Sequence, residues 1–92
     1  MRFDFDAGKS RALRANPKRG IGFEEAQALF DGDHMVDRRR DDPEQWRAIG
    51  WVGNVLYSVI FEVRCDRVGE LYHLVTLWRA TKEEKRMYEE NV

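Results

Sequence analysis

The segment from Val55 to Arg64 constrains the fold more than any other, because apolar side chains occupy every second position along it. One row holds Tyr57, Val59, Phe61 and Val63, and the other holds Leu56, Ser58, Ile60, Glu62 and Arg64. A period of two is typical of a β-strand with one apolar face. We therefore expect the first row to be buried beneath a covering layer.

Turn signals on both sides of this segment predict that it pairs with a strand before it and a strand after it. Gly53-Asn54 lies where a two-residue hairpin turn belongs, between residues 44–52 and the alternating strand. A second turn, residues 65–69, leads to another β-forming run over residues 70–78. The sequence thus predicts three antiparallel strands joined by short turns, over residues 44–52, 55–64 and 70–78.

Helices are predicted outside this meander. Their signals are a capping residue with a stopping proline, an apolar face at i, i+3, i+4 spacing, and a capping box. Asp6 as the cap and Pro17 as the stop predict a helix over residues 7–16. The apolar face of Phe23, Ala26, Leu29 and Phe30 predicts a second helix over residues 23–31. The capping box of Thr81 and Glu84 predicts a third over residues 82–90.

Two shorter β segments complete the predicted fold. Phe3 and Phe5 alternate with aspartates and predict a short N-terminal strand, and Met35 with Val36 predicts a short edge strand before a polar loop over residues 38–43. A chain of 92 residues is too short for a second core. We expect one α+β domain over residues 1–92: a small antiparallel sheet with two N-terminal helices and one C-terminal helix, all on one face or at the edges, and the other face free.

Charge is almost balanced, with 16 Lys and Arg against 17 Asp and Glu and a net charge of −1. No global field therefore draws a nucleic acid or a membrane to the chain, and any site for a polyanion has to be local. The single cysteine, Cys65, excludes an intramolecular disulfide, and no apolar run approaches the roughly 20 residues that span a bilayer. We expect a cytoplasmic protein with no membrane partner.

The sequence lacks the motifs of several enzyme classes. It contains no glycine-rich phosphate loop, no H-E-x-x-H motif and no nucleophile elbow, and its only histidines are His34 and His73. Asp4 with Asp6 could hold a divalent cation, as could Asp41-Asp42, but solvated carboxylates and a helix cap are the simpler interpretation. We expect no metal and no cofactor.

Cationic side chains at the predicted strands suit a phosphate group. Arg64 lies with Glu62 on the less apolar row, Arg47 lies on the neighbouring strand, and Arg79 ends the last strand. Converging guanidinium groups at these positions would bind an RNA phosphate and stabilise the charge that develops when the RNA is cleaved. Arg64, Arg79 and Arg47 are therefore candidate catalytic residues.

Cleavage of RNA without a metal also needs a group that transfers protons. Arginine is always charged and cannot do this. Glu62 and His73 are the candidates, although strict alternation places His73 on the face of Val75 and Leu77.

A structural interpretation of the same residues stays open. In that interpretation Glu62 and Arg64 form a surface ion pair, and His73 is a satisfied, half-buried histidine. Arg38, in a run of three arginines, is a candidate RNA contact or part of a loop neutralised by neighbouring aspartates. Trp78 is a candidate platform for base stacking or part of the core.

Three stretches of the chain match, in order, the pattern of a known family. Phe5-Asp6 with Lys9 and the segment 18–26 (KRGIGFEEA) resemble "F-D-x-x-K … K-H-G-I-x-F-x-E-A", and the segment 44–50 (EQWRAIG) resembles "E-R-[FW]-x-x-I-G". The segment 79–84 (RATKEE) with Tyr88 is similar to an ending "R-[KR]-A-T-x-x-E" followed by a tyrosine. Together these stretches cover nearly the whole chain and resemble the BrnT-like toxins.

The resemblance implies a RelE-like α+β fold and a ribonuclease that stops translation. It also implies a BrnA-like antitoxin as partner, with promoter DNA bound only through the complex with that antitoxin. Arg19, Gln45 and Trp78 depart from the pattern, which has His at the first position and Arg at the other two. Arg47 lies on the same strand face as Gln45 and can substitute for the missing cation, and Arg79 matches the second basic position of the ending.

Three function classes are consistent with these observations. The chain is a metal-independent endoribonuclease toxin, a non-catalytic member of the same fold that binds protein or RNA, or an unrelated small interaction domain. In the first class Arg47, Arg64 and Arg79 should share one pocket, and in the other two they should be scattered.

Overall fold

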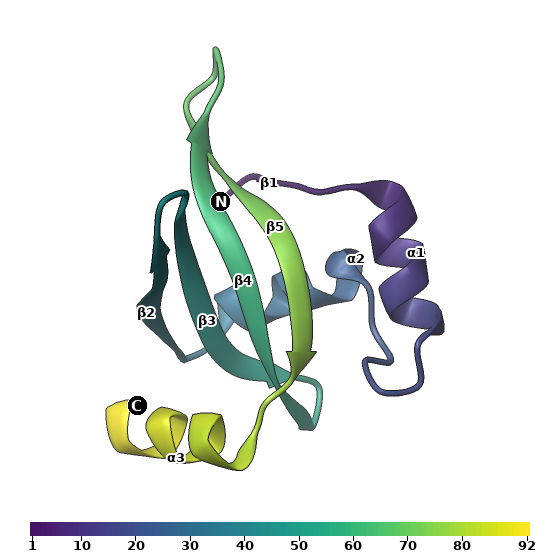
Figure 1. Ribbon diagram of the computed structural model, residues 1–92, viewed down its shortest axis with the longest axis vertical. Helices are drawn as coiled ribbons and strands as arrows, with labels where there is room; N and C mark the ends of the chain where they lie inside the picture. The colour runs from purple at the N-terminus through teal and green to yellow at the C-terminus, as the bar shows by residue number, and fades with distance from the viewer.

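A five-stranded sheet with strand order β1-β5-β4-β3-β2 runs through the middle of the molecule in the computed structural model, which describes residues 1–92 (Figure 1). The elements in chain order are β1 (Phe3–Asp4), α1 (Ala7–Ala15), α2 (Phe23–Ala26), the 3₁₀ helix η1 (Gln27–Asp31), β2 (His34–Asp41), β3 (Glu44–Val52), β4 (Val55–Cys65), β5 (Glu70–Arg79) and α3 (Lys82–Asn91).

The predicted meander of three strands is confirmed by the antiparallel pairs β3–β4 and β4–β5. Gly53 has φ +60° in the turn between β3 and β4, and a glycine at this first turn position suits a type II′ hairpin. The prediction of an entirely antiparallel sheet is wrong, because β1 pairs with β5 in parallel. The sheet is therefore mixed. The two helices and three further strands separate β1 from its pairing partner β5 along the chain.

The prediction of a loop over residues 38–43 is wrong for residues 38–41, which belong to β2. β2 continues to Asp41 and pairs with β3 along all of it, with a register irregularity between Arg38 and Arg40. An edge strand tolerates charged residues because one of its sides faces water. The guanidinium group of Arg38 also lies 4.9 Å from the ring centre of Trp46, which gives this polar strand a cation–π contact with its neighbour.

The three predicted helical regions are confirmed. Asp6 caps α1 by accepting a hydrogen bond of 2.7 Å from the Lys9 amide, and Thr81 and Glu84 form the capping box of α3. The region 23–31 begins as an α-helix and ends as the 3₁₀ helix η1. Ser10 joins the first two helices, because its buried hydroxyl accepts a 2.8 Å hydrogen bond from the Phe23 amide.

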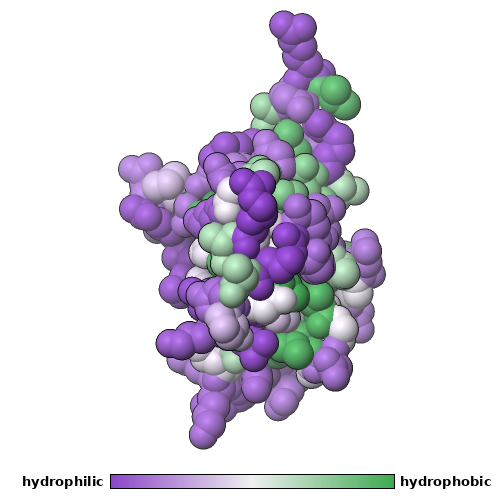
Figure 2. All heavy atoms as spheres, turned by 90° about the vertical axis from the view of Figure 1, so that its right-hand side faces the viewer, coloured by the Kyte–Doolittle hydropathy of each residue, from purple (hydrophilic) through white to green (hydrophobic).

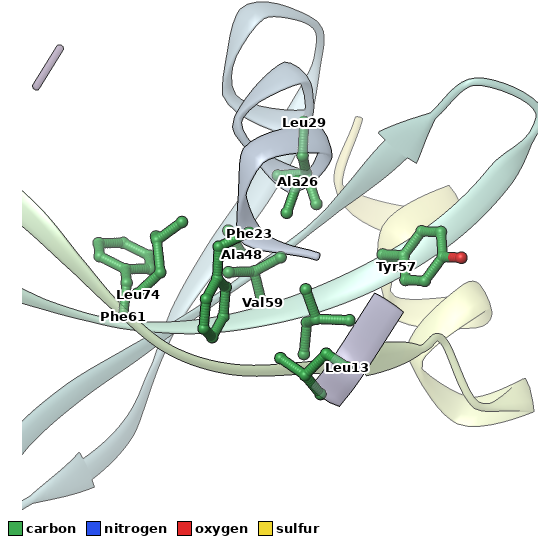
Figure 3. Packing of buried hydrophobic residues seen from close by; sticks show 10 residues of the cluster. Leu13, Phe23, Ala26, Leu29, Ala48, Tyr57, Val59, Phe61 and Leu74 are labelled. Atoms are coloured by element: carbon green, nitrogen blue, oxygen red, sulfur yellow. The ribbon is translucent and has the colours of Figure 1, made fainter. Parts of the chain in front are cut away.

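The main core lies between the sheet and the first two helices, on the side that we call the helix face (Figure 3). Tyr57, Val59 and Phe61 are buried there, as their alternation predicts, at 2%, 0% and 2% exposure. The helices and the other strands contribute Leu13, Phe23, Ala26, Leu29, Ala48, Leu74 and Leu77. Burial of the central β4 row thus holds α1 and α2 in place.

The opposite side of the sheet, which we call the second face, is not free as predicted. α3 lies across part of it, apart from α1 and α2 (Figure 1), and the other row of β4 is buried with Leu56 at 5%, Ser58 at 0% and Ile60 at 3% exposure. A smaller core here holds Ile49, Leu56 and Ala80 with Met35, Met87 and Tyr88 packed against it. The prediction that all helices lie on one side or at the edges is therefore wrong for α3.

The hairpin of β4 and β5 extends beyond the rest of the molecule (Figure 1). Val63 is 40% exposed there, so its predicted burial is wrong, because the helices do not reach this end of the strand. Most of the surface that Figure 2 shows is hydrophilic, with hydrophobic atoms near the top of the view and a larger group of them in the lower half. No helix has the length and apolar character of a membrane-spanning helix.

Candidate functional site

A bulge in β5 decides which side chains meet on the second face. Ile60 pairs with Thr76 and Phe61 pairs with Leu74, so Val75 has no partner in the register. The alternation of β5 is reset at this point, and His73 pairs with Glu62 instead of facing the helices. The expectation that His73 shares a face with Leu77 is therefore wrong.

His73 is held by an aspartate from the first strand. Its Nδ1 lies 2.6 Å from Oδ1 of Asp4, because β1 pairs with β5 at this position. A carboxylate only accepts hydrogen bonds, so Nδ1 carries the hydrogen, and in the neutral form of the ring the free lone pair is on Nε2. The His73 side chain is 24% exposed, which leaves the ring open to a ligand.

Glu62 of β4 is paired with His73 of β5, and its carboxylate accepts hydrogen bonds from two side chains. Gln45 Nε2 donates a 2.8 Å hydrogen bond to Oε2, and Arg64 donates hydrogen bonds of 2.6 and 3.1 Å to Oε1. The hydrogen bond from Gln45 and then those from Arg64 lower the pKa of Glu62 below its usual range. Glu62 is therefore a fixed anion at neutral pH that positions Arg64.

We call Asp4, Gln45, Glu62, Arg64 and His73 the His73 cluster. It joins a base with a free nitrogen to a guanidinium group whose side chain is half exposed. Arg64 uses two of its five N–H donors on Glu62, so three remain for a phosphate. The arrangement can accept a proton and bind an anion at neighbouring positions, which is what acid–base cleavage of a phosphodiester requires.

Arg47 lies on the same face but is occupied by carboxylates. Its Nε and Nη2 donate hydrogen bonds of 2.9 and 2.5 Å to Asp37, and its Nη1 lies 3.3 Å from Glu84 Oε2. The side chain is only 12% exposed, and the hydrogen bonds to Asp37 raise its pKa. Its position between β2, β3 and α3 is that of a structural ion pair.

Trp78 lies further along β5 on the second face. Its Nε1 donates a 2.9 Å hydrogen bond to Glu84, and the guanidinium carbon of Arg39 lies 5.6 Å from the centre of its ring. Both residues, together with Arg47, line a polar cavity of about 580 Å³. Trp78 and Arg39 can therefore contact a ligand that crosses this face.

Arg79 and Arg38 are not part of this arrangement. Arg79 pairs with Tyr57, and a β-carbon at Gly20 would lie 3.0 Å from its Nη2, so its guanidinium group lies against the loop after α1. Arg38 pairs with Trp46 and forms ion pairs of 3.5 Å with Asp41 and 3.4 Å with Glu44. The structure thus places Arg47, Arg64 and Arg79 at three separate positions, so the prediction that these three arginines share one pocket in an endoribonuclease is wrong.

Several members of the site could not be recognised from the sequence. The sequence offers Asp4 as a metal ligand or a solvated carboxylate, and its alternation with Phe3 predicts a strand without showing that this strand pairs with β5. Arg39 rather than Arg38 faces Trp78, because Arg39 lies two residues after Asp37, which pairs with Arg47 on the second face, whereas Arg38 pairs with Trp46 on the helix face. No three side chains of His, Cys, Asp or Glu converge in a way that could hold a metal ion.

Comparison with known proteins adds no family to these observations. No protein-family model matches the chain, and no curated protein matches it either. The function of the chain therefore has to be inferred from its own sequence, its fold and the geometry of the His73 cluster.

Proposed function

We propose that this chain is a metal-independent endoribonuclease with a RelE-like fold, a BrnT-like toxin of a type II toxin–antitoxin system. The observation that carries the proposal is the pair of Asp4 and His73 facing Glu62 and Arg64. The order of elements, two N-terminal helical segments, a meander and a C-terminal helix, supports it, as do the three motif resemblances.

The reaction uses the 2′-hydroxyl of the RNA as the nucleophile. Nε2 of His73 accepts the proton of this hydroxyl, and the 2′-oxygen bonds to the adjacent phosphorus. Arg64 binds the phosphate oxygens and stabilises the charge that they gain in the transition state. The bond to the 5′-oxygen then breaks, and this oxygen takes the proton from the His73 imidazolium.

Asp4 acts through His73 and is a positioning residue. It fixes the ring orientation and the tautomer that leaves Nε2 free, as a carboxylate behind a histidine does in other acid–base sites. Trp78 and Arg39 extend the surface along β5, where Trp78 lies five positions after His73, or about 16 Å along the strand. A base stacked on Trp78 therefore belongs to a different nucleotide from the one that is cleaved.

The proposed cellular partner is a small BrnA-like antitoxin that covers the second face or α3. A ribonuclease that stops translation has to be masked in the cell that makes it. The His73 cluster is open, so a folded partner that lies over Arg64 and His73 would block RNA. The resemblance to the BrnT-like toxins adds that promoter DNA is bound only through that complex.

The second candidate function is binding of RNA or protein without cleavage. Two observations favour it: Arg47, Arg64 and Arg79 are scattered, as we expect for a protein that does not cleave RNA, and carboxylates already pair with both Arg47 and Arg64 on this face. The same surface would then bind a partner through Trp78 and Arg39, and His73 would be a structural histidine held by Asp4.

Induced expression in a bacterium separates the two functions, with growth and RNA integrity as readouts. We expect growth arrest and cleaved RNA for the native chain, and RNA cleavage in vitro that a chelator does not inhibit. His73→Gln and Arg64→Ala should each slow cleavage by about 10²-fold or more, because each removes a group used in the transition state.

His34→Gln is the matched control, because His34 is the other histidine, lies at the start of β2 outside the His73 cluster, and makes its one side-chain hydrogen bond with the carbonyl oxygen of Gly32. It should stay toxic, as should Arg79→Ala. Asp4→Asn should lower the rate, because an amide can also donate to Nδ1 and the tautomer of His73 is then no longer fixed. A native chain that neither arrests growth nor cleaves RNA, or a fully toxic His73→Gln variant, refutes the proposed activity and leaves the binding function.

A further inference from the structure

A second cavity, of about 400 Å³, lies between α3 and the hairpin of β3 and β4, away from the His73 cluster. Its floor is apolar, because Leu56 and Ala80 of the smaller core line it at 5% and 9% exposure. Trp51 and Tyr88 form one wall, with their ring centres 6.2 Å apart in an edge-to-face arrangement. The volume suits one large side chain or a small ligand.

Two cationic residues without a carboxylate partner are among the residues that line this cavity. Arg79 and Lys85 line it, and neither takes part in any ion pair of the chain, although five other arginines do. Glu89 is the only acidic residue in the lining. The local charge is therefore positive in a chain whose net charge is −1.

Trp51 extends this apolar surface beyond the cavity, since it is 49% exposed. Tryptophan, tyrosine and arginine are the residue types that contribute most binding energy in protein interfaces, and Trp51 is half exposed beside one of each. A small molecule would occupy the cavity alone and leave most of Trp51 in water. A polypeptide segment would cover both.

We propose that this cavity binds a segment of a partner protein in which one large aliphatic side chain is flanked by carboxylates. The aliphatic side chain would lie on Leu56 and Ala80 beneath Trp51, and the carboxylates would pair with Arg79 and Lys85. The surface and its occupant are defined by apolar fit and charge complementarity, so the inference holds whether or not the chain cleaves RNA.

The test is an NMR titration of the full chain with three blocked tripeptides. The probe is acetyl-Asp-Leu-Asp-amide, and the two controls replace both Asp by Asn or Leu by Ala. We expect the probe to shift the indole N–H resonance of Trp51, assigned with Trp51→Phe, and the amide resonances of Leu56 and Ala80. The Asn peptide should bind about three- to tenfold more weakly, because it loses two exposed ion pairs. The Ala peptide should bind at least about tenfold more weakly, because it loses three buried carbons.

Variants on α3 test the charge without disturbing the floor. Lys85→Glu should weaken binding of the probe at least about threefold, whereas Arg86→Glu, the adjacent exposed position outside the cavity, should change it less. The inference is overturned by an absence of shifts at Trp51, by equal binding of the Asp and Asn peptides, or by equal effects of the two variants. None of these results tests the proposed ribonuclease activity of the His73 cluster, because the titration contains no RNA.

Discussion

Glu84 is the only acidic residue that is buried, at 4% exposure, and its replacement by glutamine tests how α3 is held on the sheet. Oε1 accepts hydrogen bonds of 2.9 Å from both Trp78 Nε1 and the Thr81 amide. Oε2 lies 3.3 Å from Nη1 of Arg47. Glu84→Gln keeps the shape and the oxygen that Trp78 and Thr81 use, but it replaces the other oxygen by an amide group that cannot accept from Arg47.

The expected loss of stability depends on the contacts that Arg47 keeps. Removal of one member of a buried ion pair costs about 3–5 kcal/mol when the remaining charge is left unpaired. Arg47 retains two hydrogen bonds to Asp37, of 2.9 and 2.5 Å, so the variant loses one charge-assisted hydrogen bond instead. Such a bond contributes about 1.5–3 kcal/mol. We therefore expect the free energy of unfolding to fall by about 2 kcal/mol at pH 7.

Urea unfolding followed by tryptophan fluorescence measures this change. Glu83→Gln is the matched control, because Glu83 is the adjacent exposed acid of the same helical turn and should change stability by no more than about 0.5 kcal/mol. A Glu84→Gln variant as stable as Glu83→Gln would refute the reasoning, since the Arg47–Glu84 contact would then contribute nothing.

The dependence on pH gives the same test a second readout. Burial raises the pKa of Glu84, but hydrogen bonds from the Thr81 amide and Trp78, with the charge of Arg47, outweigh it and lower the pKa below its usual range. A lowered pKa stabilises the fold above the unfolded pKa and loses this contribution as pH falls through the folded pKa. The difference between native chain and Glu84→Gln should be constant above about pH 5 and narrow below about pH 4.

Three further changes test the fold. Phe61→Ala should lower the free energy of unfolding by about 3–5 kcal/mol in urea, because the ring is 2% exposed within the main core, and a loss below about 1 kcal/mol would contradict that position. Gly22→Ala should destabilise by about 1–3 kcal/mol in the same assay, since its β-carbon would lie 2.5 Å from Ser10 Oγ and 2.9 Å from Ser10 O, and unchanged stability would mean that α1 and α2 move apart freely. Hydrogen bonds from Arg2 hold the pKa of Asp66 well below its usual range. Asp66→Asn should therefore reduce the loss of stability on acidification below about pH 4, measured by thermal unfolding. The same loss of stability in the variant and the native chain would contradict it.

The parts of the fold that local patterns determine could be predicted from the sequence. The alternation of Tyr57, Val59 and Phe61 identified the buried row of β4, and the spacing of Thr81 and Glu84 identified the start of α3. These patterns act within a few residues, so no long-range partner is needed to recognise them. The helices and the meander are determined by patterns of this kind.

The parts that depend on distant partners could not be predicted. β2 has the composition of a polar loop until β3 supplies its hydrogen-bonding partner, and β1 is too short to show that it pairs in parallel with β5. The unpaired Val75 moves His73 to the other face, and no residue type in that segment marks the bulge. The same shift brings Asp4, Glu62 and His73 together, so the site could be predicted only in part.

The two arginines of the second face show why spacing alone does not identify a phosphate ligand. Arg47 and Arg64 occupy comparable positions on adjacent strands, and each has a carboxylate partner. Arg47 is 12% exposed and divides its donors between Asp37 and Glu84, whereas Arg64 is 50% exposed and keeps three donors free. A substitution of Arg47 therefore acts on stability, and any loss of activity that it causes should be restored at lower temperature. A substitution of Arg64 acts on the bound phosphate, and its loss should persist at every temperature at which the chain is folded.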